Sequence, residues 1–122
     1  MGKTLTTLIL LLSIVSMGYS QEEKQLFAMV YSKGKAWNEN VSTSEQLKFK
    51  QHSIHLQNLR KEKKIIIGGR YSDYGFMILE AKNIDEAKLI TQRDSTVING
   101  VFKVELFEFL PFFEGCIGEE KQ

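Results

Sequence analysis

Two ionisable side chains, His52 and Asp94, stand where an amphipathic helix normally carries apolar residues. Burying such groups costs free energy unless each has a partner. If the two predicted helices cover the same face of one sheet, the two groups can converge in one pocket, which is where acid-base chemistry or ligand binding usually resides. The two stripes, at the three-and-four spacing of a helical face, are Phe49, His52, Leu56, Leu59 and Ala87, Ile90, Asp94.

Each of the two residues also has a simpler structural interpretation. His52 can be a packed core residue whose ring bonds one backbone carbonyl. The pattern places Asp94 at a helix C-terminus, where the macrodipole disfavours a carboxylate unless a cation such as His52, Arg93 or Arg70 compensates it. Alternatively, Asp94 bonds backbone amides in the turn before Gly100.

His55 follows His52 by three residues and projects near the same helical face, so it is a candidate substrate-binding residue. A His-x-x-His pair can ligate a transition metal, but two ligands do not complete a tetrahedral site. Asp94 is the only further metal ligand that the pattern suggests. The sequence therefore predicts no metal site.

Gly69 and Arg70 lie at the end of a short isoleucine-rich strand and complete the predicted substrate-binding set. A glycine here lets the backbone bend or lets a ligand approach closely. Arg70 is interpreted either as a surface cation or as the holder of an anionic group such as a carboxylate. Gly68-Gly69 is followed by a strand rather than a helix, unlike a phosphate-binding loop, and no cofactor is predicted.

Hydrophobic periodicity and turn residues predict the order strand, helix, strand, strand, helix, strand. This order is typical of a ferredoxin-like βαββαβ sandwich, an α+β fold in which one antiparallel sheet carries both helices on one face. Capping boxes support both helix starts. The predicted strands are 25–32, 64–70, 74–82 and 101–110; the helices run from Ser42 or Thr43 to about Glu62 and from Asn83 to Asp94 or Ser95.

Several predicted strands are apolar on both faces, although two short helices can cover only one side of the sheet. In the last strand, Phe102 and Val104 serve one face while Phe107 and Phe109 lie on the other. Something must cover this second face, and a second copy of the chain is the simplest solution. The sequence therefore predicts a homodimer whose sheets pack against each other.

The first twenty residues have the composition of a signal peptide. Lys3 supplies a positive start, residues 5–17 an apolar run, and Gly18-Tyr19-Ser20 a small-residue cleavage site. The run is too short to span a bilayer comfortably, which needs about 20 apolar residues. A secreted or periplasmic protein starting near Gln21 is expected, without stable membrane insertion, while a retained N-terminal anchor stays open.

The remaining 21–122 stretch has the length of one domain, with a C-terminal tail from about residue 116 expected to be disordered. The chain has 16 Lys plus Arg and 15 Asp plus Glu, and removal of Lys3 leaves 15 of each. This balance gives no electrostatic case for binding nucleic acid. Cys116 is the single cysteine, so no intramolecular disulfide is predicted.

The sequence resembles the YCII-related (YciI-like) family in the order and spacing of several short motifs. His52 begins the helical stretch 52–59, Gly69-Arg70 stands where the family has Gly-Pro, and Asp94-Ser95 replaces Asp-Pro. The resemblance implies a ferredoxin-like dimeric α/β barrel with a site built on the histidine and the aspartate, here His52 and Asp94. Both departures from the pattern replace a proline, and one of them introduces the cation of Arg70. The remaining matches are Gly100-Val101-Phe102 and Pro111-Phe112.

These observations predict a small enzyme in which His52 is the general acid or base and Asp94 orients its ring. Proton transfer, isomerisation or elimination on a small organic molecule would need no cofactor. The alternative is a non-catalytic dimeric module that binds a small ligand in the same pocket. A third hypothesis, an interaction protein using the 107–113 surface, predicts a monomer with that patch exposed.

Overall fold

The computed structural model describes residues 23–113 and 115. Four strands form a single antiparallel sheet in the order β2-β3-β1-β4, which confirms the predicted ferredoxin-like topology. The elements are β1 (Gln25–Lys33), the 3-10 helix η1 (Thr43–Glu45), α1 (Phe49–Lys61), β2 (Ile65–Tyr71), β3 (Tyr74–Ala81), α2 (Ile84–Gln92), α3 (Ser95–Ile98) and β4 (Phe102–Glu108).

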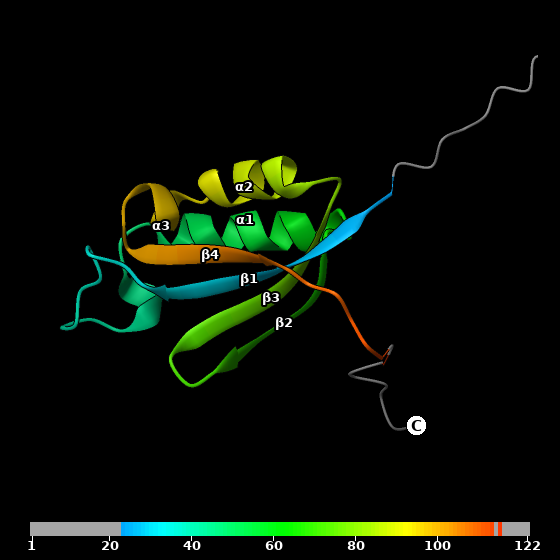
Figure 1. The fold of residues 1–122 in the computed structure, drawn as a ribbon. Coiled ribbons are helices and arrows are strands. Elements are labelled where there is room, and N and C mark those ends of the chain that lie inside the picture. The colour runs from blue at the N-terminus through cyan, green and yellow to red at the C-terminus, as the bar shows by residue number, and fades with distance from the viewer. Residues whose placement is uncertain (1–22, 114, 116–122) are drawn as a thin grey trace, which may run out of the picture.

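The helices lie together on one face of the sheet, as Figure 1 shows. On this inner face, every second residue of β1 is buried, beginning with Phe27. Ala87 and Ile90 of α2 and Leu59 of α1 close over these side chains. The alternation follows from the two-residue period of a strand, which sends successive side chains to opposite faces. The buried core residues are Phe27, Met29, Tyr31, Leu59, Met77, Leu79, Ala81, Ala87 and Ile90.

The opposite, outer face of the sheet is also apolar. Val30 pairs with Phe76, and Ala28 lies between Ile78 and Phe107. Phe107 is 52% exposed, and the described helices all lie on the other side. The second apolar face predicted from the sequence is therefore present.

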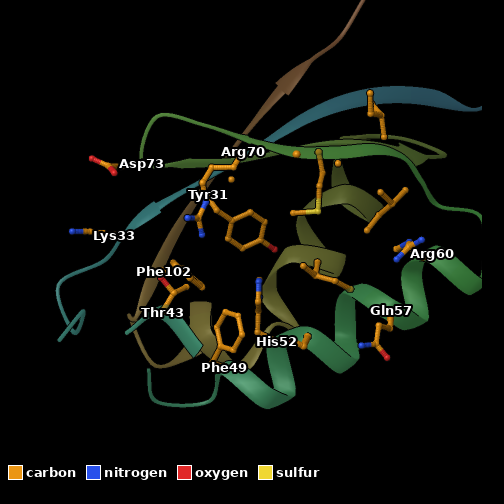
Figure 2. A pocket seen from close by; sticks show the side chains of 18 of the residues that line it. Tyr31, Lys33, Thr43, Phe49, His52, Gln57, Arg60, Arg70, Asp73 and Phe102 are labelled. Carbon is orange, nitrogen blue, oxygen red and sulfur yellow. The ribbon is translucent and has the colours of Figure 1, made fainter. Parts of the chain in front are cut away.

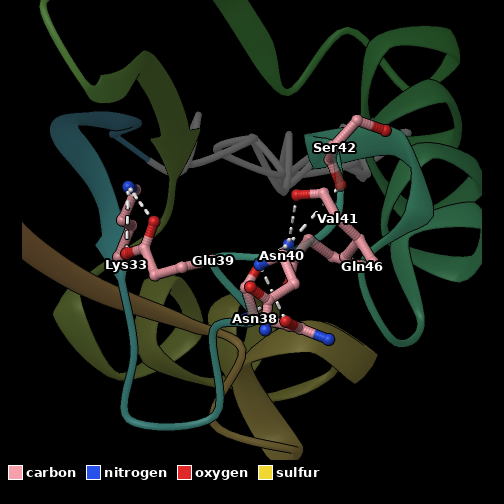
Figure 3. A network of polar contacts seen from close by, with 7 residues as sticks. All are labelled: Lys33, Asn38, Glu39, Asn40, Val41, Ser42 and Gln46. Carbon is pink, nitrogen blue, oxygen red and sulfur yellow. Dashed lines mark hydrogen bonds and ion pairs between the residues drawn. The ribbon is translucent and has the colours of Figure 1, made fainter.

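The first predicted helix starts later than expected. Ser42 and Glu45 do form a capping box, but only around the single turn of η1. Lys48 then adopts a left-handed backbone with φ of 64° before α1 begins. The buried side chain of Gln46 explains the break, because it bonds the backbone of Asn38, Val41 and Ser42, and so ties the loop to this point (Figure 3).

The prediction that the second helix runs to Asp94 or Ser95 is wrong. Asn83 caps α2 as expected by accepting from the Glu86 amide, but the helix ends at Gln92. Asp94 instead caps the N-terminus of α3 by accepting from the Thr96 amide. A carboxylate is favoured at this end of a helix, so Asp94 needs no cation to offset the dipole.

The predicted signal peptide, the tail from about residue 116 and Cys116 fall outside the described residues. Within residues 23–113 and 115, no helix is both long and apolar enough to cross a membrane.

Candidate acid-base site

His52 and Asp94, 42 residues apart in the chain, are in direct contact. Nδ1 of His52 lies 2.5 Å from Oδ2 of Asp94. His52 is 8% exposed and Asp94 is 0% exposed, so the pair is buried. The stripe of α1 supplies the histidine, and the turn between α2 and α3 supplies the carboxylate. The predicted convergence of these two residues is confirmed.

Four hydrogen bonds surround the Asp94 carboxylate. Oδ2 accepts from His52 and from the Tyr31 hydroxyl, which lies 3.1 Å away. Oδ1 accepts from the Thr96 amide at 3.0 Å and from the Thr96 hydroxyl at 2.6 Å. A buried carboxylate is expensive unless its oxygens are paired, and here both are. The carboxylate is thus held in one orientation.

This environment decides which groups are ionised. Burial alone would raise the pKa of Asp94, but the hydrogen bonds from His52 and Thr96, together with the charge of His52, lower it below its ordinary value of 3.8. Burial and the neighbouring negative charge of Asp94 raise the pKa of Tyr31 far above its ordinary value of 10.0. At neutral pH, Asp94 is therefore a carboxylate and Tyr31 is a neutral donor.

The ionised carboxylate also fixes the histidine tautomer. Because Asp94 can only accept, Nδ1 of His52 carries a hydrogen and donates it. The other ring nitrogen, Nε2, makes no hydrogen bond with the described residues, and His52 lines the cavity. In the neutral ring, Nε2 is thus the atom that can take a proton from a bound molecule.

Three aromatic rings hold the imidazole in place. The ring centroids of Phe102, Tyr31 and Phe49 lie 5.1, 5.3 and 5.7 Å from that of His52. Contacts of this kind favour edge-on and tilted arrangements and limit ring rotation. Trp37 packs on Phe102 at 5.5 Å, which places the loop after β1 beside the same cluster.

A cavity of about 770 Å³ lies beside His52, between α1 and the β2-β3 half of the sheet. This volume suits a small organic molecule. Figure 2 shows Tyr31 pointing into it from the sheet and His52 from α1. Asp94 does not line it but lies behind the histidine. Other lining residues include Lys33, Leu56, Arg60, Ile65, Arg70 and Met77.

Two glycines, which have no side chains, help to keep this cavity open. Gly68 pairs with Met77, and Gly75 pairs with both Arg70 and Tyr31. Paired residues share a face of the sheet, so both glycines face the helices. A Cβ on Gly68 would lie 3.1 Å from Met77 Cγ, and one on Gly75 would lie 3.4 Å from Tyr31 Cβ. Side chains at these two positions would narrow the cavity.

Gly69 and Arg70, which the sequence predicted to bind substrate, both line the cavity but in different ways. Gly69 pairs with Phe76 of the outer face, and a Cβ there would meet nothing within 4 Å. It therefore contributes backbone. Arg70 lies on the inner face, beside Tyr31 in Figure 2.

The structure does not bring His55 to this cavity. It is absent from the lining residues, and its Nε2 is buried without a hydrogen-bond partner among the described residues. Three residues along a helix rotate a side chain by about 300°, which sets His55 about 60° from His52. The other α1 residues that line the cavity, such as Ser53 and Leu56, lie on the opposite side of His52, so His55 falls outside the lining. Within residues 23–113 and 115, no group of three or more His, Cys, Asp or Glu side chains could hold a metal ion.

Sequence reasoning missed Tyr31 and Thr96. Both faces of β1 are apolar, so the sequence did not distinguish Tyr31 from the hydrophobic residues around it. Thr96 could have been found from the sequence. Aspartate is a preferred N-cap residue, and its side chain commonly accepts a hydrogen bond from the amide two residues later, which here belongs to Thr96.

The sequence was also compared with models of known protein families. The YCII-related domain model matches residues 26–110, so the chain belongs to the YCII-related family. Searches of curated proteins and of solved structures gave no match.

Proposed function

We propose that this protein is a cofactor-free enzyme that moves protons on a small organic molecule bound beside His52. Isomerisation, elimination and simple proton transfer belong to this class. One observation carries the proposal: Nδ1 of His52 is committed to a buried carboxylate, while Nε2 has no hydrogen-bond partner among the described residues and His52 lines the cavity. This is the arrangement in which imidazole serves as general base and then as general acid.

Each neighbour of His52 has a separate part in this mechanism. Asp94 holds the tautomer and stabilises the imidazolium that forms when Nε2 takes a proton. Tyr31 and Thr96 position the carboxylate without competing for the proton, since they donate to it. They are positioning residues, whereas His52 is the residue that meets the substrate.

Hydrogen exchange at carbon tests this proposal while the natural substrate is still unidentified. A panel of small molecules with acidic C–H bonds would be incubated with the protein in D₂O and followed by NMR. We expect catalysed exchange for some members, and a loss of about a hundredfold to ten-thousandfold in the His52→Gln variant. Gln51→Ala, at an exposed position on the same helix, is the matched control.

Exchange that persists in the His52→Gln variant would refute the catalytic role. Binding of panel members without exchange by the wild-type protein would instead favour the non-catalytic ligand-binding module. ¹⁵N NMR of the histidine ring gives a second readout, because the wild-type ring should show a protonated Nδ1 and the Asp94→Asn variant a changed tautomer balance.

We further propose that two copies of the chain pair through their outer sheet faces. The apolar residues of that face, from Ala28 and Val30 to Phe107, support this arrangement, since no described helix covers them. Sedimentation should give the wild-type protein a mass of twice the chain mass. The Phe107→Glu variant should sediment as a monomer. Leu89→Glu is the control, because Leu89 is also 52% exposed but lies on α2. A monomeric wild-type protein would contradict the proposal.

Export is the last element of the proposed function and is supported by the composition of residues 1–20 alone. N-terminal sequencing of the protein recovered from its native cells should start near Gln21. An intact Met1 would show that the segment is retained.

A further inference from the structure

We propose that the cavity selects small organic carboxylates with an apolar body, and that Arg70 binds the carboxylate while the body lies against the hydrophobic lining near His52. This inference rests on the proposed function and names its substrate class.

The charge of the lining favours an anion. The cavity is lined by three cationic side chains, Lys33, Arg60 and Arg70. Asp73 is the one carboxylate among the described lining residues. Lys33 already pairs with both oxygens of Glu39, at 3.1 and 3.2 Å. The guanidinium groups of Arg60 and Arg70 make no ion pair or hydrogen bond with the described residues, so both are available to a ligand.

Arg70 is the better placed of these two arginines. The pairing register puts Arg70, Gly75 and Tyr31 in one row across the inner face. Because Gly75 has no side chain, Arg70 has room to lie toward Tyr31, as Figure 2 shows. Arg60 projects from the last turn of α1 at the other end of the cavity, where a cation also complements the helix dipole.

The chemistry of a guanidinium favours a carboxylate in this position. Its planar fork can donate two parallel hydrogen bonds to the two oxygens of one carboxylate. A neutral amide offers one oxygen and no charge, so the site should distinguish the two. This difference gives a direct experimental test.

Part of the cavity lining is apolar. Leu56 of α1, Ile65 of β2 and Met77 of β3 belong to this lining, and Gly68 has no side chain that would crowd Met77. Figure 2 shows His52 at the centre of the same wall, below Tyr31. A ligand anchored at Arg70 and extending over Met77 therefore passes His52, which places its carbon skeleton within reach of an acid-base group.

Phenylacetate and phenylacetamide are a matched pair of probes with the same shape and different charge. Their binding to the full chain would be measured by calorimetry at fixed ionic strength, with inorganic phosphate as a third titrant. We expect phenylacetate to bind at least tenfold more tightly than the amide, and phosphate not to displace it.

Three arginine variants separate a specific contact from general electrostatics. Arg70→Gln should weaken phenylacetate at least tenfold and abolish its advantage over the amide. Arg60→Gln, with the same charge change in the same cavity, should weaken it less than threefold. Arg93→Gln, exposed at the end of α2, should leave the affinity unchanged. Circular dichroism would verify that each variant is folded.

The inference is wrong if the wild-type protein binds neither probe, if it binds both equally, if phosphate displaces phenylacetate, or if Arg70→Gln keeps the discrimination. These failures differ from failure of the catalytic proposal. Hydrogen exchange that depends on His52 without carboxylate preference would overturn only the substrate class. Carboxylate preference with exchange that survives His52→Gln would overturn only the catalytic role.

Discussion

The two halves of the inner face are covered by helices of similar kind, yet one half is filled and the other is hollow. Under α2, Ala87 and Ile90 close tightly over the apolar side chains of the sheet. Beside α1, the sheet presents Gly68 and Gly75, and a cavity remains. The filled half stabilises the layers, so the hollow half can hold polar groups at some cost in free energy.

The sharpest test of this contrast is Asp94→Ala. Removal of the carboxylate leaves the donors of His52, Tyr31 and Thr96 without their partner, which should lower the free energy of unfolding by about 3 to 5 kcal/mol. Denaturant titration would measure the change. Asp85→Ala, an exposed carboxylate in the first turn of α2, is the control, and an equal effect at both positions would contradict the assignment.

Truncation of one aliphatic side chain in each half should give different penalties. Ile90→Ala in the filled half is expected to lower the free energy of unfolding by about 2 to 5 kcal/mol. Leu56→Ala enlarges a space that already exists, so its penalty should stay near the transfer term alone, about 1 to 2 kcal/mol. Denaturant titration would measure both changes in the free energy of unfolding. A larger loss for Leu56→Ala than for Ile90→Ala would contradict the assignment of a filled and a hollow half.

The stability supplied by the buried polar pair behind the cavity should depend on pH, unlike that of the filled half. The pKa of Asp94 is lowered on folding, so its contribution is present above the ordinary value of 3.8 and is lost as pH falls through the lower folded value. The stability difference between the wild-type protein and Asp94→Asn should therefore shrink below about pH 4. The difference for Ile90→Ala should not change, and parallel behaviour of the two variants would contradict this prediction.

The smallest effect on stability is expected for two neighbouring glycines of β2. Gly68→Ala adds a methyl group 3.1 Å from Met77 Cγ, and the flexible methionine can shift, so stability should change by less than about 1 kcal/mol. Affinity for phenylacetate should fall, because the methyl group enters the cavity. Gly69→Ala places its methyl on the other face and should reduce affinity less. The reverse order would show that the faces are misassigned.

The sequence was sufficient to predict the fold and the central pair because both follow from periodicity. Strand and helix periods predicted the order of the elements, and the interruption of the apolar stripe of α1 identified His52. Asp94 was found by extending the stripe of α2, although that helix ends two residues before it. Gly69 and Arg70 were chosen from the end of one strand and both line the cavity, while their role in substrate binding stays a prediction.

The remaining features depend on tertiary contacts that no local pattern contains. Gln46 ends η1 through bonds to a loop several residues away, so helix propensity alone predicted one continuous helix. Asp94 was assigned to the wrong end of a helix because α3 has a single turn and too little periodicity to detect. Tyr31 reaches Asp94 across 63 residues of sequence, and only the pairing of β1 with its neighbours places it there.

The engagement of Nδ1 with Asp94 limits what one turnover can accomplish. A single nitrogen remains for exchange, so the imidazole can hold one substrate hydrogen at a time. A reaction that returns this hydrogen to another carbon of the same molecule leaves the ring as it began. An elimination closes the same cycle when Nε2 gives the hydrogen to the leaving group. A group that departs as an anion would instead leave the ring charged, and the protein would have to pass the hydrogen to solvent before accepting its next molecule.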